Sequence, residues 1–434
     1  MKQPSTQKRC QIAGLKSSHC AAVCITAFAV FSDGVAKAEG FRDATTGAFD
    51  LGRSGGRIAQ VGDSTAVQNN PANLMDINTA QAEFDPSLIY IKVHYTSPDG
   101  TEAASTIHPI KALPNFFASI PFADNRFAFG FGVTVPFGLA NQWNDKSTAF
   151  SQSTPPAGGN LTYATAYYSK LTTMNFNPTF AAKLGDHLQI GVGLDVMWSD
   201  LEFKQFVSPG LPGVFAHADG DGVGVGGNLG VTWKITDHQR LAMTYRSTMT
   251  VDYSGNVMLV NYPGNPETSF DSQIKFPNIF SVGYGIDLTD TIRLESDVEW
   301  LQFSQFKNLG VTTGSTPIGS LSQNIPENWH NTFTAGIGGD WKFAEHWVLR
   351  AGYQYFESPV PDSTFSPTIP DANQNVLTIG VGWKGEHSSL EFAYGLDFYD
   401  DRNINNPVTL GVPTTNGKYT FNVHLFSLAY RYSF

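Results

Sequence analysis

The sequence predicts an all-β protein, a transmembrane β-barrel of 14 antiparallel strands. Segments in which large apolar residues alternate with small or polar ones recur along the chain, as expected of strands with one face toward lipid. The chain is 13% aromatic and only 15% charged, a composition that suits a surface facing lipid. Short polar turns alternate with long loops, which is the asymmetry of outer-membrane barrels. No run of 18 apolar residues is present, so no transmembrane helix is predicted.

An N-terminal signal peptide is predicted over residues 1–38. Basic side chains precede an apolar run of 11 residues, 21–31, which is too short to span a bilayer as a helix. Ala36 and Ala38 then form a small-x-small cleavage site, so the mature chain is expected to start at Glu39. A retained membrane anchor is the alternative. All three cysteines lie in this segment, so the mature chain offers no disulfide and no cysteine metal site.

The charge and the motifs argue against several function classes. The net charge of −11 becomes about −15 without residues 1–38, and an acidic chain lacks the basic surface that nucleic acid requires. No cofactor, metal or catalytic residue is predicted, since neither zinc-ligand spacing nor a GxSxG nucleophile elbow is present. The GxGxxG spelling at 222–227 opens a strand rather than a helix. Asp219 and Asp221 alone are weak evidence for calcium.

The choice of residues on the two strand faces favours a barrel over a soluble sandwich, which also alternates. In Arg126–Val135, Phe127, Phe129 and Phe131 point one way, whereas Ala128, Gly130 and Gly132 point the other. In the strand from 292, a charged row lies behind an apolar face; this row consists of Arg293, Glu295, Asp297 and Glu299. Aromatic residues outside and charged or small residues inside are what an outer-membrane barrel needs.

Turn signals divide the chain into strands. Short turns lie at 123–125, 185–187, 236–239, 289–291, 344–346 and 385–387, and longer loops at roughly 139–163, 207–221, 260–270, 311–330, 358–373 and 403–420. The predicted strands are 81–95, 112–122, 126–137, 165–184, 188–206, 223–235, 240–259, 272–288, 292–310, 331–343, 347–357, 375–384, 389–400 and 421–434. Both ends of such a barrel lie on the periplasmic side. The chain stops on Phe434 in an aromatic strand, although the terminal strand of a soluble domain is the alternative.

The chain resembles the FadL-type long-chain fatty acid transport family, which includes aromatic-hydrocarbon channels. The most specific match is the element Asn70-Pro71-Ala72 with Leu74, inside GGRIAQVGDSTAVQNNPANL. Further matches follow in the family's order: Leu113-Pro114-Asn115, Pro136-Phe137-Gly138-Leu139-Ala140, Thr244-Tyr245-Arg246-Ser247 and Arg350-Ala351-Gly352-Tyr353. The resemblance implies three parts: a signal peptide at 1–38, a hatch or plug at 39–78 inside the lumen, and a barrel at 79–434.

The resemblance assigns roles to two groups of residues. The hatch motif is Asn70, Pro71, Ala72 and Leu74; glycine, asparagine and aspartate around it suit a segment that satisfies its backbone against protein or water. A disordered periplasmic tail is the alternative. The family bends its third strand inward and leaves a gap in the wall, here placed at Gly130, Gly132, Pro136 and Gly138. The alternative is that Pro136 only ends that strand at the outer rim.

Ligand contacts are predicted by the same resemblance. Candidate outer-loop contacts are Leu211, Val214 and Phe215, in a loop shorter than the long insertions of the best-known members. The family places basic residues near the ends of the fifth and ninth strands, and Lys204 and Lys307 lie close to those points. If both are rim lysines in water, an uncharged hydrocarbon becomes the favoured ligand over a fatty acid.

The predicted function is passive import of long-chain fatty acids or similar hydrophobic molecules through a hatch-gated pocket and a lateral opening. A general diffusion porin and an outer-membrane lipid-modifying enzyme are the rival functions. The expected partners are a hydrophobic small molecule, outer-membrane lipids and the barrel-assembly machinery, with the protein as a monomer. The sequence does not identify the preferred substrate or the loops that move.

Overall fold

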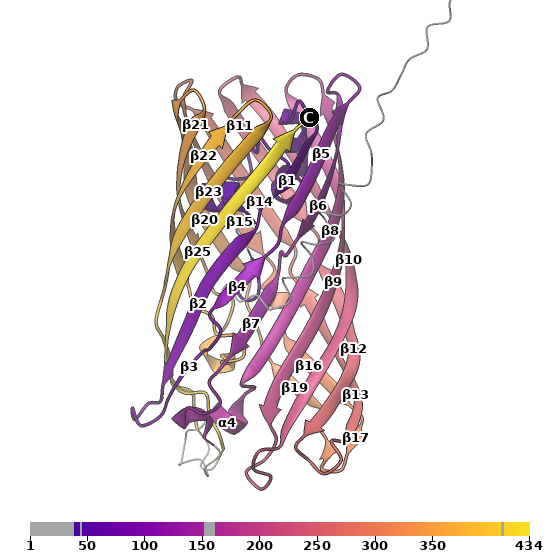
Figure 1. Ribbon diagram of the computed structural model, residues 1–434, viewed down its shortest axis with the longest axis vertical. Helices are drawn as coiled ribbons and strands as arrows, with labels where there is room; N and C mark the ends of the chain where they lie inside the picture. The colour runs from indigo at the N-terminus through magenta and orange to yellow at the C-terminus, as the bar shows by residue number, and fades with distance from the viewer. Residues whose placement is uncertain (1–38, 44–45, 152–160, 409–411) are drawn as a thin grey trace, which may run out of the picture. The chain divides into compact units, whose positions relative to one another are not determined.

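The computed structural model describes residues 39–43, 46–151, 161–408 and 412–434, and the predicted signal peptide lies outside these residues. In the described part, 23 strands form one antiparallel sheet, drawn in Figure 1. The sheet closes because the C-terminal strand β25 (Gly417–Ser433) pairs with both β1 (Gln81–Phe84) and β2 (Ser87–Thr96). No helix in these residues is long and apolar enough to cross a membrane.

The strands make 14 crossings of the barrel, as the sequence predicts. In chain order the crossings are β1 with β2; β3 (Ala103–Ser105), β4 (Ile110–Leu113) and β5 (Phe116–Phe122); β6 (Phe127–Thr134) and β7 (Gly138–Gln142); β8 (Tyr168–Leu184); β9 (Leu188–Phe206); β10 (Phe215–Thr236); β11 (Gln239–Arg246) and β12 (Met249–Val260); β13 (Glu267–Phe276) and β14 (Ile279–Asp287); β15 (Ile292–Leu301) and β16 (Asn308–Thr313); β19 (Gln323–Pro326) and β20 (Thr332–Ala344); β21 (Trp347–Phe356); β22 (Gln374–Lys384); β23 (Ser388–Tyr399) and β24 (Arg402–Ile404); and β25.

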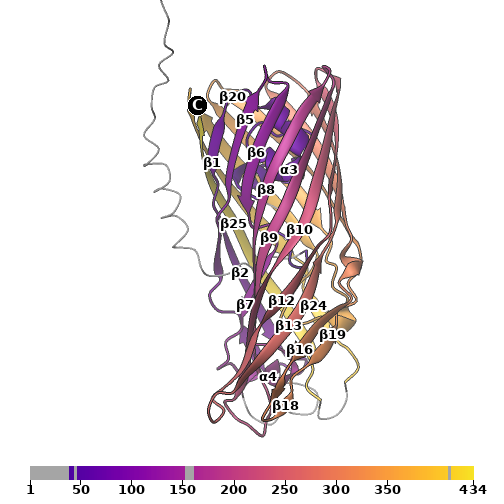
Figure 2. The ribbon, with the colours of Figure 1, turned by 90° about the vertical axis from the view of Figure 1, so that its right-hand side faces the viewer.

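Short helices and one hairpin complete the structure. They are α2 (Ala48–Gly52), α3 (Ala66–Asn69), the 3-10 helix η1 (Pro71–Asp76), η2 (Thr148–Phe150), α4 (Leu161–Ala164), η3 (Phe303–Gln305), η4 (Asp362–Thr364), and the hairpin of β17 (Ser315–Thr316) and β18 (Gly319–Ser320). Figures 1 and 2 show the tight turns at the end that also holds the C-terminus, and α4 and the longer loops at the opposite end.

Several predicted boundaries differ from the structure, since β7 extends into the predicted loop 139–163 and β25 begins inside the predicted loop 403–420. The loop predicted over 207–221 ends earlier, because β10 already begins at Phe215. The glycine and aspartate residues in 215–221 favour a loop locally. In the structure, however, this stretch pairs with β9 on one side and with β12 on the other. Pairing with two neighbours outweighs weak local strand preference.

The inner face of the barrel changes character along its length. Toward the tight turns it is charged: Glu295, Asp297 and Asp195 are almost fully buried there. Toward the long loops it becomes apolar, and in β2 the inward side chains are Ile89, Ile91, Val93 and Tyr95. The outer face carries the exposed apolar side chains, among them Phe129, Val192, Leu194, Trp198 and Phe333. The lumen is therefore polar at one end and hydrophobic at the other.

Candidate functional site

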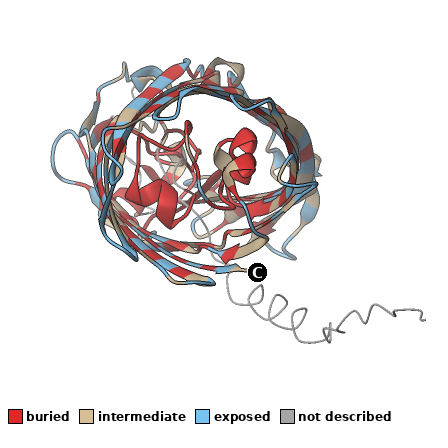
Figure 3. Cartoon of the chain, turned by 90° about the horizontal axis from the view of Figure 1, so that it is seen from above, coloured by how far each residue is buried: buried red, intermediate tan, exposed pale blue. Residues whose placement is uncertain are grey.

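Residues 39–43 and 46–78 are packed against the inner face of the barrel wall, and Figure 3 shows buried chain inside the barrel in the view from above. The element Asn70-Pro71-Ala72 fastens this segment to the wall. The amide group of Asn70 donates to the Ile58 carbonyl (2.8 Å) and to Thr232 Oγ1 of β10 (2.9 Å), while its oxygen accepts from Ala72 N–H (3.1 Å). A buried asparagine that satisfies both ends of its amide in this way fixes the start of η1 against β10.

Glycines in the wall make room for the segment. A Cβ on Gly191 of β9 would lie 2.3 Å from the Pro71 carbonyl carbon, which is backbone and unable to move aside. A Cβ on Gly130 of β6 would lie 2.9 Å from Leu74. The structure thus brings Leu74 of the predicted hatch motif against Gly130, one of the predicted glycines of the third strand. Gly130 and Gly132 lie in an unbroken ladder with β5 and β8, so they accommodate the segment where β6 is regular.

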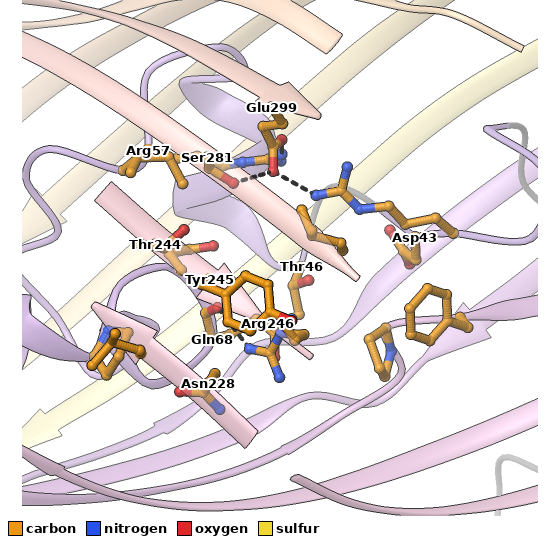
Figure 4. A pocket seen from close by; sticks show the side chains of 18 residues that line it. Asp43, Thr46, Arg57, Gln68, Asn228, Thr244, Tyr245, Arg246, Ser281 and Glu299 are labelled. Atoms are coloured by element: carbon orange, nitrogen blue, oxygen red, sulfur yellow. Dashed lines mark hydrogen bonds and ion pairs between the residues drawn. The ribbon is translucent and has the colours of Figure 1, made fainter. Parts of the chain in front are cut away.

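Arginines of the segment meet the acidic row of β15. Arg53 Nη2 lies 2.6 Å from Glu295, and Arg42 Nη2 lies 2.8 Å from Glu299, which also pairs with Arg57. These ion pairs are buried, so removing one partner would leave an uncompensated charge at a large cost. Figure 4 shows Arg57, Ser281 and Glu299 pointing toward one another around a cavity of about 50 Å³ between segment and wall.

Phe41, near the start of the segment, lies in an aromatic cluster. The Phe41 ring is 1% exposed and lies 5.1 Å from Trp329, 5.3 Å from Phe276 and 5.6 Å from Phe306, measured between ring centroids. Gly40 has a φ of +70°, and a Cβ there would lie 2.3 Å from Trp329. A left-handed backbone and this close approach both require glycine at that position.

The third crossing is interrupted between β6 and β7, at Val135 to Phe137. Within the interruption, Asp43 N–H donates to the Pro136 carbonyl (2.8 Å) and Gly138 N–H donates to the Phe41 carbonyl (2.7 Å). The start of the N-terminal segment therefore replaces a neighbouring strand at the break. Pro136 lacks an N–H, which removes one ladder bond at this point. Pro136 and Gly138 thus lie at the break itself, and the prediction that they form a lateral opening stays a prediction.

A large cavity of about 720 Å³ occupies the outer, apolar end of the lumen. Phe41 and Leu139 are among its lining residues. Its lining is mostly apolar, including Leu171, Leu201, Phe203, Phe206, Val257, Ile274, Phe306, Val311 and Ile369. Lys170 and Glu202 are the charged residues among the described lining residues, and they face each other in the β8–β9 ladder. The cavity is therefore mostly apolar, and its described lining residues carry no net formal charge.

The predicted ligand contacts lie around this cavity rather than in its wall. Lys204 Nζ lies 3.2 Å from Glu202 Oε1 and 4.5 Å from the centre of the Tyr168 ring. Lys307 is exposed, and neither lysine is among the lining residues. Their role in binding a carboxylate stays a prediction. Leu211, Val214 and Phe215 also lie outside the lining; Phe215 packs on Tyr167 and Phe206.

Two buried carboxyl groups of the segment titrate at unusual pH. Burial raises the pKa of Asp50 to about 7, against the opposing effect of Arg57. Burial likewise raises the pKa of Glu39 to about 6, while Arg42 acts in the opposite direction. Asp50 accepts from the Thr46 N–H (3.2 Å) and from Asn69. Desolvation therefore dominates over the favourable partners at both groups.

The residues that sequence reasoning missed come from distant parts of the chain. No local motif marks the aromatic residues around Phe41, which are Trp329, Phe276 and Phe306. Nor does one mark Asp371, which accepts from the Glu39 and Gly40 N–H groups. The described residues include no group of three or more His, Cys, Asp or Glu side chains arranged to hold a metal ion.

A closed barrel with an apolar outer face, an inner segment and a hydrophobic cavity defines a channel-type protein of the bacterial outer membrane. The family described as outer membrane protein transport protein (OMPP1/FadL/TodX) matches residues 29–434. The chain belongs to that family.

Relatives and solved structures agree with this assignment. The long-chain fatty acid transport protein of Salmonella typhi is 24% identical over 426 residues, which span 88% of this chain and 92% of that protein. Outer membrane protein P1 of Haemophilus influenzae is 23% identical, and the match covers 92% of this chain and 96% of that protein. A FadL homologue of Pseudomonas aeruginosa has a TM-score of 0.76 at 21% identity, covering 91% of this chain and all of that chain. The toluene transporter TodX of P. putida has a TM-score of 0.73 at 18% identity, covering 90% and 99%. The structural likenesses show the fold.

Proposed function

We propose that this protein imports long-chain fatty acids or similarly hydrophobic molecules across the outer membrane by passive diffusion. The observation that carries the proposal is the position of Phe41. Its ring lines the large apolar cavity, and its carbonyl bonds to Gly138 at the break in the wall. A ligand that displaces Phe41 from the cavity therefore disturbs the contact that fills the break.

The driving force is transfer of the ligand from water into the cavity. Each buried methylene contributes ~0.8 kcal/mol, so about 15 carbons gain on the order of 12 kcal/mol. A water-filled pore gives no such gain. Release through the wall into lipid keeps the hydrocarbon chain of the ligand out of water, so this step needs no energy source.

Three steps describe the transport cycle. The ligand enters from the loop end and occupies the cavity lined by Phe203, Phe206 and Ile369. Phe41 then leaves its aromatic cluster, and the bonds of residues 41–43 to Pro136 and Gly138 break. The base of the segment stays in place, because Asn70 and Arg53 hold it to β10 and β15. The ligand then leaves through the opened side of the barrel.

A deletion tests the plug and the transport function together. A variant without residues 39–75 is expected to assemble as a barrel but to conduct ions in a planar bilayer, because the lumen loses its filling. The wild-type protein is expected to stay closed to ions and to take up oleate in cells that lack another carrier. A large steady current through the wild-type protein would favour a porin, and an unchanged leak in the deletion variant would contradict the plug.

An uncharged aromatic hydrocarbon is the second candidate ligand. It is favoured by one observation: neither Lys204 nor Lys307 lines the cavity, whose described charged residues are Lys170 and Glu202. The toluene transporter that shares the fold makes this class of ligand a reasonable choice. Mass spectrometry of ligands that copurify from native membranes separates the two candidates. We further propose a monomer in contact with outer-membrane lipids and dependent on the barrel-assembly machinery.

A further inference from the structure

The outer ends of crossings 9 and 10 form an arm beside the large cavity. The arm spans residues 308–326 and consists of β16, β19 and the small hairpin of β17 and β18 between them. β16 and β19 pair antiparallel with each other. Figure 2 shows β13, β16 and β19 at the loop end, away from the C-terminus.

The inner face of the arm is apolar. Leu309 and Ile325 stand opposite each other in the β16–β19 ladder and therefore share one face. Both line the cavity, together with Val311 and Leu321. Ile325 is still 36% exposed, and all residues of β19 are exposed. The arm thus presents apolar side chains both to the cavity and to water.

The arm carries no charge. Residues 308–326 contain no Asp, Glu, Lys, Arg or His. The outer faces of β10 and β12 differ, because they expose the carboxylates of Asp219, Asp221 and Asp252. An anionic amphiphile therefore approaches the arm without the repulsion that those carboxylates exert.

The sides of the arm are weakly attached. β16 pairs with β13 over three residue pairs, whereas β12 and β13 pair over ten. Two further hydrogen bonds join the arm to β13: Ser272 Oγ donates to the Gly310 carbonyl (2.8 Å), and Gly314 N–H donates to the Ser269 carbonyl (3.2 Å). Among the described residues, β19 has no strand partner other than β16. An element with so few backbone bonds opens more easily than the rest of the wall.

The two ends of the arm meet at one point. The Lys307 carbonyl accepts from the Glu327 N–H (2.8 Å). Just outside these residues stand Phe306 and Trp329, whose ring centroids are 4.9 Å apart. Both rings pack on Phe41. Movement of the arm about this point therefore acts on the cluster that holds Phe41.

We propose that the arm is the capture surface for the hydrocarbon chain of the ligand and the lid of the cavity, and that it lifts from β13 to admit the chain. This inference rests on the proposed function and deepens it. The chain first contacts Ile325 at the exposed edge and then passes beneath Leu309 and Val311. The arm recognises the chain rather than the head group, so a fatty acid and its methyl ester are admitted alike.

The physical basis is burial of apolar surface. Ile325 and the ligand chain both leave water when they meet, which favours their contact. Lifting the arm breaks only a short ladder with β13, while the bond at Lys307 keeps its base in place. When the arm returns to β13, it separates the bound chain from water.

A reversible crosslink tests the lid. Asp271 of β13 and Thr312 of β16 stand opposite each other and are both exposed, so cysteines at these two positions can form a disulfide that ties the arm to β13. The matched control is Ser254→Cys with Asp271→Cys, which ties the same position of β13 to β12 instead. Residues 39–434 contain no other cysteine.

Uptake of oleate and of methyl oleate is measured in cells lacking another carrier, with the cysteines oxidised and after reduction. We expect the oxidised variant Asp271→Cys with Thr312→Cys to import both ligands roughly tenfold more slowly, and reduction to restore uptake. The control is expected to import equally in both states. Ile325→Gln should weaken the apparent affinity for both ligands roughly tenfold and leave uptake at saturating ligand unchanged. Heat-modifiable migration reports on barrel folding.

Each result separates this inference from the function on which it rests. Wild-type protein that imports neither ligand defeats the proposed function itself. If wild type imports both ligands and the oxidised arm crosslink does so at the same rate, the lid is refuted. An equal loss in the oxidised control would assign the effect to β13 rather than to the arm, which also overturns the lid. Unchanged apparent affinity in folded Ile325→Gln overturns the capture surface.

Discussion

Replacing Gly191 by alanine tests how the N-terminal segment is seated. The new Cβ would lie 2.3 Å from the carbonyl carbon and 2.6 Å from the carbonyl oxygen of Pro71, and 2.6 Å from the nitrogen of Ala72. These are backbone atoms held by Asn70, so the segment must move away from β9 as a unit. The barrel ladder itself needs no change, because β9 keeps its pairing with β8 and β10.

The magnitude follows from the contacts that are lost. Overpacking of this kind costs ~1–3 kcal/mol. Moving Pro71 also strains the two hydrogen bonds from Asn70 to Ile58 and Thr232, worth about 1 kcal/mol each. The sum is about 3–5 kcal/mol, which lowers the ratio of docked to undocked segment by roughly two to three and a half powers of ten.

Cysteine labelling measures that ratio directly, since residues 39–434 contain no cysteine. Ala66→Cys places a thiol at a position that is 0% exposed. We expect rapid maleimide labelling in Gly191→Ala and slow labelling in the parent. Gly227→Ala is the matched control, because its Cβ would lie 3.4 Å from its nearest neighbour, the Gly193 carbonyl oxygen. Equal labelling of Gly191→Ala and the control in folded barrels would refute the seating of Pro71 against β9.

Three further predictions concern the start of the segment and the charges near the cavity. Cleavage after Ala38 would give Glu39 an ammonium group 3.2 Å from Asp371 Oδ1. We therefore expect Asp371→Asn to release residues 39–43 from the wall and to raise the ion leak in bilayers. An unchanged leak with correctly processed protein would contradict this. The raised pKa of Asp50 means that the docked state binds the extra proton, so the contribution of Asp50 to docking weakens as pH rises from about 4 to about 7 and then stays level. Proteolysis of the segment should be faster at pH 8 than at pH 5, and Asp50→Asn should reduce that dependence to the smaller part that comes from Glu39, whose pKa is raised to about 6. If Lys204 and Lys307 bind the ligand carboxylate, the variant with both changed to alanine binds oleate less tightly but methyl oleate as before; equal change for both ligands removes that role.

The sequence by itself determined the barrel. Period-2 alternation in β9, where Val192, Leu194 and Trp198 face outward and Asp195 inward, depends only on the geometry of neighbouring residues on a strand. Tight turns such as Gly185 to His187 are likewise local. The motif Asn70-Pro71-Ala72 was identified by its resemblance to the FadL-type family, and its residue types suit a segment with tight turns.

The tertiary structure decided what the lumen contains. The strand pattern predicts which residues face inward. It does not predict that the inner face is charged at one end, with Glu295 and Asp297, and apolar at the other, with Ile91 and Val93. Nor does it predict the cavity at the apolar end. The partners of Phe41 come from four different crossings and loops: Phe137, Phe276, Phe306 and Trp329. Such contacts join residues hundreds of positions apart, and only closure of the sheet sets their distances, so no local pattern records them.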